Sequence, residues 1–163
     1  MARLALFTFG VLSHPAEHPA TRAFLAADAE VWPALEAAPG LLGHSGYPGE
    51  PGPPSWGRFV IPRFFDGPSD SITPQTLSLW RDLTSAADFA YRGRHGEALG
   101  HAREWFQTPR WPTHVLWWVG DRERPDWASG CARLERLHDR GPGPEAFDFR
   151  HRHGPDGTAL AKI

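Results

Sequence analysis

The chain has 163 residues, 40% of them hydrophobic, with 17 Lys and Arg against 19 Asp and Glu and a formal net charge of −2. This length fits one domain that can bury a core, and the hydrophobic content excludes a largely disordered chain. A general nucleic-acid-binding protein needs a basic face that neutralises phosphates, so the slightly acidic balance argues against that class.

The N-terminal part of the chain predicts a strand, a helix and a second strand. Residues 4–9 are apolar on both alternating faces, as in a central strand. Thr21 is a candidate N-cap of a helix that Gly40 ends, and residues 41–47 can form a short strand. The apolar spacing of the helix includes Phe24, Leu25, Asp28, Val31, Trp32 and Leu35.

Proline then dominates the middle of the chain. Residues 48–56 contain four prolines and two glycines, which predicts a loop that either closes over a pocket or is inert. A short apolar run at residues 59–65 belongs to the same long hairpin. Residues 76–80 read as a strand. The next helix, with Thr84 or Ser85 as its cap, is expected to bend at its glycines and to continue as far as residue 106.

The C-terminal part repeats this alternation of strand and helix. Residues 113–119 predict a strand that is buried on both faces. Pro125 opens a helix that ends at a Gly-Pro-Gly-Pro segment, and residues 146–150 predict a last strand. The polar tail, residues 151–163, is expected to be loose.

This order of elements favours one α+β domain over residues 1–150, with an antiparallel sheet and helices on one face. The other face of such a sheet is apolar and needs a cover. A second copy of the chain is the usual cover, so we expect a homodimer.

The predicted compartment is the cytoplasm. Cys131 is the only cysteine, so no disulfide can form within the chain. The apolar start of the chain is too short for a signal sequence, and no stretch reaches the length of a membrane span. On a helix face with Leu134, Cys131 is expected to be a core residue.

Eight tryptophans are many for a chain of this size. They can fill a core and a dimer interface, or some of them can line a ligand cavity. They are Trp32, Trp56, Trp80, Trp105, Trp111, Trp117, Trp118 and Trp127.

Four short motifs carry a resemblance to a known family: SLW at 78–80, AYRGRH at 90–95, REWF at 103–106 and LWWV at 116–119. In this order they resemble the bacterial family DUF3291, and residues 132–137 and 141–147 continue the match. The resemblance implies a ferredoxin-like dimeric α/β barrel. That superfamily includes cofactor-free quinone-forming monooxygenases and haem-degrading monooxygenases. One departure is Thr8, where the family pattern has Asn.

His95 is the candidate catalytic residue. By helical spacing it shares a face with Tyr91, Leu99 and Phe106. A His in an aromatic cavity can act as a general base, or it can ligate haem iron, or it can simply bond to a carbonyl and pack. His101 points elsewhere on the helix and is expected to lie at the surface. The candidate substrate-binding residues are Thr8, Trp80, Tyr91, Arg94, Trp105, Phe106, Trp117 and Trp118.

The resulting hypothesis is an enzyme without a cofactor or metal that acts on a hydrophobic aromatic or polyketide-like molecule. It would be a monooxygenase or would catalyse a proton-transfer rearrangement. The alternatives are a non-catalytic dimer that binds a small ligand and a haem protein with His95 as axial ligand. The sequence lacks a phosphate-binding loop, a nucleophile elbow and an HExxH motif, which disfavours nucleotide cofactors and Ser or zinc hydrolysis.

Overall fold

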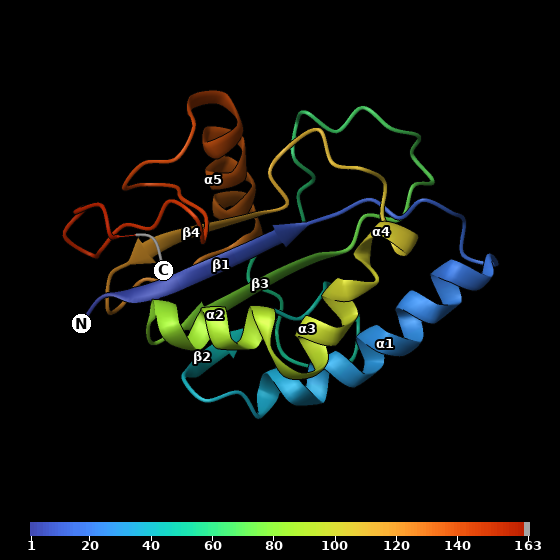
Figure 1. Ribbon diagram of the computed structural model, residues 1–163, viewed down its shortest axis with the longest axis horizontal. Helices are drawn as coiled ribbons and strands as arrows, with labels where there is room; N and C mark the ends of the chain where they lie inside the picture. The colour runs from blue at the N-terminus through green and yellow to red at the C-terminus, as the bar shows by residue number, and fades with distance from the viewer. Residues whose placement is uncertain (162–163) are drawn as a thin grey trace.

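The computed structural model describes residues 1–161 and is built on one four-stranded antiparallel sheet (Figure 1). Its strands lie in the order β2-β3-β1-β4. This is the arrangement of a ferredoxin-like sheet, in which each helical crossover skips one strand. The predicted α+β class is therefore confirmed. The strands are β1 (Arg3–Phe9), β2 (Leu41–His44), β3 (Gln75–Trp80) and β4 (His114–Val119).

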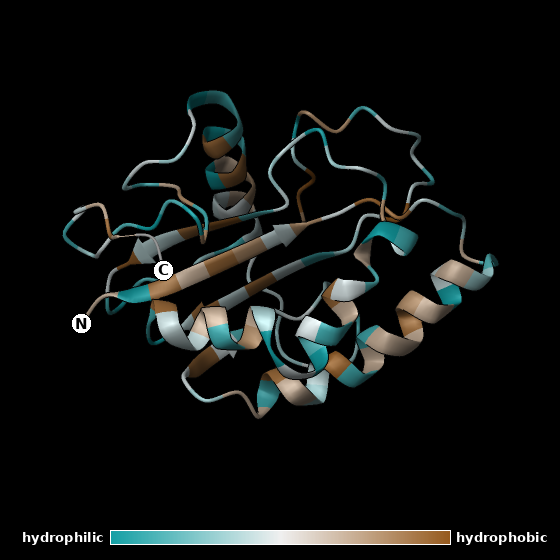
Figure 2. Cartoon of the chain, in the orientation of Figure 1, coloured by the Kyte–Doolittle hydropathy of each residue, from teal (hydrophilic) through white to brown (hydrophobic). Residues whose placement is uncertain are grey.

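Helices cover both faces of this sheet. The helices are α1 (Pro19–Glu36), α2 (Leu83–Tyr91), α3 (Gly93–Gly100), α4 (Ala102–Trp105) and α5 (Trp127–Arg140). Helices α1 to α4 lie on one side, whereas α5 stands on the other (Figure 1). The strands that separate the two layers are largely apolar (Figure 2). The prediction that all helices share one face was wrong, because alternate side chains of β1 and β4 are apolar and each set needs its own cover.

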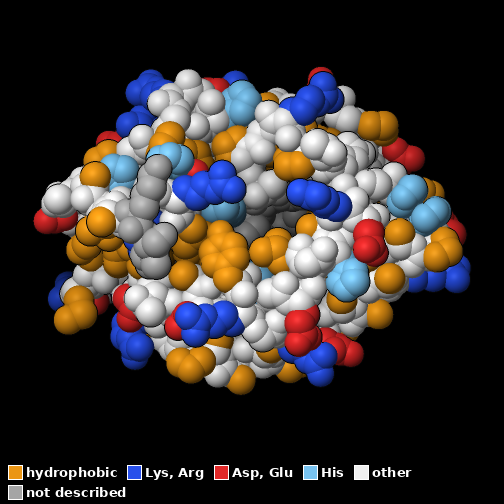
Figure 3. All heavy atoms as spheres, in the orientation of Figure 1, with side chains coloured by type: hydrophobic (Ala, Val, Ile, Leu, Met, Phe, Trp, Pro, Cys, Tyr) orange, Lys and Arg blue, Asp and Glu red, His pale blue; other side chains and the backbone are white. Residues whose placement is uncertain are grey.

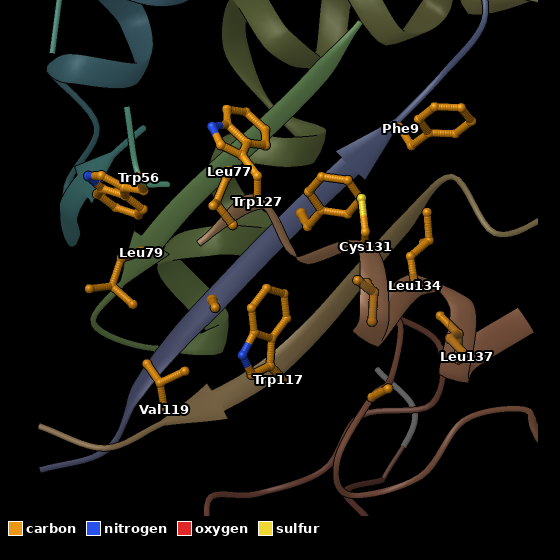
Figure 4. Close-up of a cluster of buried hydrophobic side chains, with 14 of the residues drawn as sticks. Phe9, Trp56, Leu77, Leu79, Trp117, Val119, Trp127, Cys131, Leu134 and Leu137 are labelled. Carbon is orange, nitrogen blue, oxygen red and sulfur yellow. The ribbon is translucent and has the colours of Figure 1, made fainter. Parts of the chain in front are cut away.

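Helix α5 and the proline-rich loop bury the face that was expected to bind a second copy. Phe7 on this face packs against Trp127 of α5, with ring centroids 6.3 Å apart. Trp117, Leu134 of α5 and Trp56 of the loop belong to the same buried cluster (Figure 4). Only Trp56, at the end of this loop, belongs to the core, whereas residues 48–52 are exposed and no residue of 48–56 lines either of the two cavities beside helices α1 and α3. A homodimer stays a prediction, but an open sheet face no longer supports it.

The helix boundaries follow from local caps that differ from the expected ones. The imidazole Nδ1 of His18 caps α1 by accepting the backbone N–H of Ala20, while Thr21 is buried. Asp82 caps α2 by accepting the N–H of Ser85 at 2.8 Å. The break between α2 and α3 lies at Gly93, whose φ of 55° is in the region that favours glycine. A bend was predicted there.

The C-terminal segment differs from its prediction. Residues 146–150 do not form a strand, because only Phe147 pairs with Leu116. The tail folds back over the sheet as far as it is described, and Trp118 Nε1 donates to the carbonyl of His153 at 2.8 Å. Residues 162–163 lie outside the described part of the chain. Over residues 1–161, no helix combines the length and the apolar character that crossing a membrane requires.

Candidate functional site

A cavity of about 610 Å³ lies between the sheet and helices α1, α3 and α4. Its volume falls within the range of about 300–1,000 Å³ that is usual for small-molecule sites. Figure 3 shows a hollow near the middle of this side of the protein, with basic side chains on both sides of its mouth. Arg103 is among the residues that line the cavity. The Phe, Trp and Tyr side chains of its wall are Phe9, Phe24, Trp32, Phe89, Tyr91, Trp105, Phe106, Trp111 and Phe149.

His95 lies in the first turn of α3, directly after the break at Gly93. Its Nδ1 is 2.8 Å from the carbonyl oxygen of Ala90. A carbonyl can only accept, so Nδ1 carries a hydrogen and the neutral ring holds its lone pair on Nε2. The ring also packs against Phe89, with centroids 5.0 Å apart. These contacts fix the ring and leave Nε2 as the nitrogen that can accept a proton.

Asp28 is a second titratable group in the cavity wall, contributed by α1. Its Oδ2 accepts a hydrogen bond from Trp32 Nε1 at 2.9 Å. Burial raises the pKa of Asp28, whereas the bond from Trp32 and the charge of His95 act in the opposite direction. A carboxyl and an imidazole that interact across one cavity are a suitable pair for proton transfer.

The strands contribute polar side chains to the same cavity. Thr8 and Thr76 place their Oγ1 atoms 2.6 Å apart. His114 lies beside Thr8 in the β1–β4 ladder, and burial lowers the pKa of His114. The sheet side of the cavity thus combines these polar groups with the apolar side chains of Leu6, Phe9 and Leu77.

Five of the nine predicted site residues line the cavity, namely Thr8, Tyr91, His95, Trp105 and Phe106. Helical spacing indicated three of them, His95, Tyr91 and Phe106. Contact of these residues with a substrate stays a prediction.

The other four do not line it. Trp80 is fully buried behind Phe89, with its Nε1 bonded to Ser78. Trp117 points to the α5 face, and Trp118 lies under the tail. Arg94 is exposed and within 3.5 Å of Glu30 and 3.4 Å of Glu97. Strand alternation alone could not predict which tryptophans lie on the face of the sheet that borders the cavity.

Sequence reasoning did not identify Asp28 or Thr76 as candidate site residues. The signal for Asp28 was present, because an acid at an apolar position of an amphipathic helix points inward. Two other expectations agree with the structure. His101 is exposed beside Glu104, and Cys131 is buried with its pKa raised by burial to about 12.

A second hollow, of about 580 Å³, lies between the C-terminal end of α1 and helices α2 and α3, and His95 lies in its wall as well. Three arginines line it, and each is within 3.5 Å of a neighbouring acid. Among residues 1–161, no cluster of three or more His, Cys, Asp or Glu side chains could hold a metal ion.

The family model described as "Domain of unknown function (DUF3291)" matches residues 3–162. The chain belongs to the DUF3291 family. Among proteins with curated descriptions, none matches this DUF3291 chain.

Several solved structures are similar to this DUF3291 protein at low sequence identity. A protein of unknown function from Nitrosomonas europaea is 17% identical, with a TM-score of 0.47, over 77% of this chain and 96% of that one. SnoaB, a cofactor-independent oxygenase from Streptomyces nogalater, is 13% identical, with a TM-score of 0.42, over 77% of this chain and 98% of that one. Likeness at this level carries no argument about activity.

Proposed function

We propose that this DUF3291 protein is an enzyme that removes a proton from a hydrophobic aromatic small molecule bound in the cavity. His95 is the proposed base. The observation that carries the proposal is the bond between His95 Nδ1 and the Ala90 carbonyl, which leaves Nε2 as the proton acceptor of a ring in the cavity wall. Histidine is the side chain that most often acts as a general base in enzymes.

The proposed step breaks a C–H bond next to a carbonyl, or an O–H bond of a phenol. The proton moves to His95 Nε2, and the electron pair moves onto the substrate oxygen as an enolate or phenolate. This anion can then rearrange and recover its proton. Alternatively, it can react with O₂, which converts a CH₂ group to a carbonyl and releases water. Both proposed reaction classes, rearrangement and cofactor-independent monooxygenation, therefore share the first step.

Deuterium exchange tests this first step without the natural substrate. 2-Tetralone is an aromatic ketone with acidic C1 hydrogens, and their replacement in D₂O can be followed by NMR. We expect the protein to accelerate exchange over buffer, and His95→Gln to lose at least about 100-fold of that acceleration, as is usual when a general base is removed.

His101→Gln is the matched control, because His101 is an exposed imidazole in the connection between α3 and α4. It should exchange 2-tetralone like the wild type. Exchange by the wild type at the buffer rate, or equal exchange by His95→Gln and the wild type, contradicts the proposal. Tight binding of aromatic ligands without exchange would favour the non-catalytic ligand-binding protein.

The haem alternative uses the same atom, His95 Nε2, as a metal ligand and not as a base. His95 Nε2 would bind iron, and its Nδ1–H bond to a carbonyl is the usual support of a metal-bound imidazole. His95 is thus a suitable ligand for haem iron, but a nitrogen bound to iron cannot also accept a proton. A Soret band that appears when haem is added and that is lost in His95→Gln would favour this alternative.

A further inference from the structure

Three polar side chains form a row across the cavity wall, one from each of three neighbouring strands. Thr8 on β1 is paired with His114 of β4 on one side and with Thr76 of β3 on the other. Paired residues of an antiparallel ladder point to the same face, with Cβ atoms about 4.5–5.5 Å apart. All three line the cavity. We call His114, Thr8 and Thr76 the polar row.

The polar row contains a buried nitrogen without a protein partner. Within residues 1–161, His114 Nε2 is buried and makes no hydrogen bond, while Nδ1 lies 3.3 Å from Thr113 Oγ1. Burial lowers the pKa of His114, and the nearby charges of Asp148 and Arg150 act in opposite directions. The ring is therefore neutral near neutral pH. A buried nitrogen of this kind costs free energy until a partner reaches it.

A partner that can both donate and accept fits this site whichever tautomer His114 adopts. A neutral imidazole Nε2 donates in one tautomer and accepts in the other. Of the two threonines, one hydroxyl donates to the other, which leaves one hydrogen and several lone pairs for a further group. A ligand hydroxyl can bond to Nε2 in either tautomer and to either threonine hydroxyl. A carbonyl or an ether can only accept.

We propose that the polar row binds the hydroxyl group of a phenol or enol, so that the ligand of this cavity is a hydroxylated aromatic compound. Its ring would lie against the apolar side chains of α1 and α4, and its oxygen against Thr8, Thr76 and His114. This inference rests on the proposed function in one respect: it assumes that the ligand binds in the same cavity. It deepens that function by naming the chemical group that the site selects.

Two ligands that differ by one hydroxyl group test the inference. Isothermal titration calorimetry with the protein in the syringe gives the Kd of 2-naphthol and of naphthalene. The wild type should bind 2-naphthol more tightly than naphthalene. In Thr8→Val, Thr76→Val and His114→Phe this preference should fall, by about tenfold in the most affected variant, because each loses a hydrogen-bonding group of the polar row.

The affinity for naphthalene serves as the internal control for folding, since it should change little in any variant. Thr108→Val is the matched control, because Thr108 is exposed at the cavity but lies outside the polar row. It should keep the wild-type preference. An unchanged preference in all three row variants, or no preference in the wild type, overturns the inference.

The outcomes also separate this inference from the proposed function. A preference that depends on the polar row, without deuterium exchange, supports the hydroxyl site and contradicts the enzyme. Exchange through His95, with no effect of the row variants on the preference, supports the enzyme and contradicts the hydroxyl site. If neither naphthalene nor 2-naphthol binds, the cavity is not a ligand site and both fail.

Discussion

The carboxyl group of Asp28 lies in a cavity wall whose aromatic side chains come largely from the helices. Within residues 1–161 it has one side-chain hydrogen bond, from Trp32 Nε1. Because burial raises the pKa of Asp28, the folded protein binds its proton more tightly than the unfolded chain does. Stability is therefore lost as the pH rises from the unfolded pKa through the folded pKa.

Asp28→Asn should remove this loss, because an amide oxygen can still accept from Trp32 Nε1 and carries no charge. We expect the variant to unfold at a higher urea concentration than the wild type at about pH 7, and this advantage to shrink toward about pH 4. Asp70→Asn, in an exposed loop, is the control and should show no such trend. A variant that is less stable than the wild type at neutral pH would show that the carboxylate stabilises the fold.

The individual residues also show which parts of the site can be predicted from the sequence. Helical spacing placed His95 and Tyr91 correctly on the cavity side, because a helix fixes the angle between neighbouring side chains. Strand alternation separated Trp117 from Trp118 but could not identify the face with the cavity. The polar row depends on the register of three strands far apart in sequence, which one sequence does not specify.

At the scale of elements, α5 needs a close approach to β1. A Cβ on Gly130 would lie 2.8 Å from Cδ2 of Phe7, a fully buried ring. A side chain at this position would push the helix away from the sheet and loosen its packing on Trp127. The composition of α5 predicted a helix with one apolar face, but it did not show which layer that face covers.

Gly130→Ala should therefore destabilise the protein by about 1–3 kcal/mol, as is typical of overpacking in a core. Gly100→Ala is the matched control, because Gly100 ends α3 and a Cβ added there would have nothing within 4 Å. Alanine there should be neutral or stabilise by up to about 1 kcal/mol, since it is the better helix former. Urea unfolding measures both. Equal effects of the two substitutions would contradict the close approach.

At the scale of the whole molecule, one sheet separates two layers with different roles. The α5 side is a closed core that includes Trp56, Trp117 and Trp127, whereas the other side contains the cavity. Tryptophans thus lie both in the core and at the cavity, with Trp32, Trp105 and Trp111 at the cavity. Because the α5 side is already covered, a homodimer would need a surface elsewhere.

The crystal structure of the protein with 2-naphthol tests the central claim most directly, because it locates the ligand. We expect the naphthol ring inside the cavity, its hydroxyl within hydrogen-bond distance of Thr8, Thr76 or His114, and His95 Nε2 facing the ligand. A naphthol bound only outside the cavity, or inside it with the polar row and His95 both out of reach, would contradict this claim.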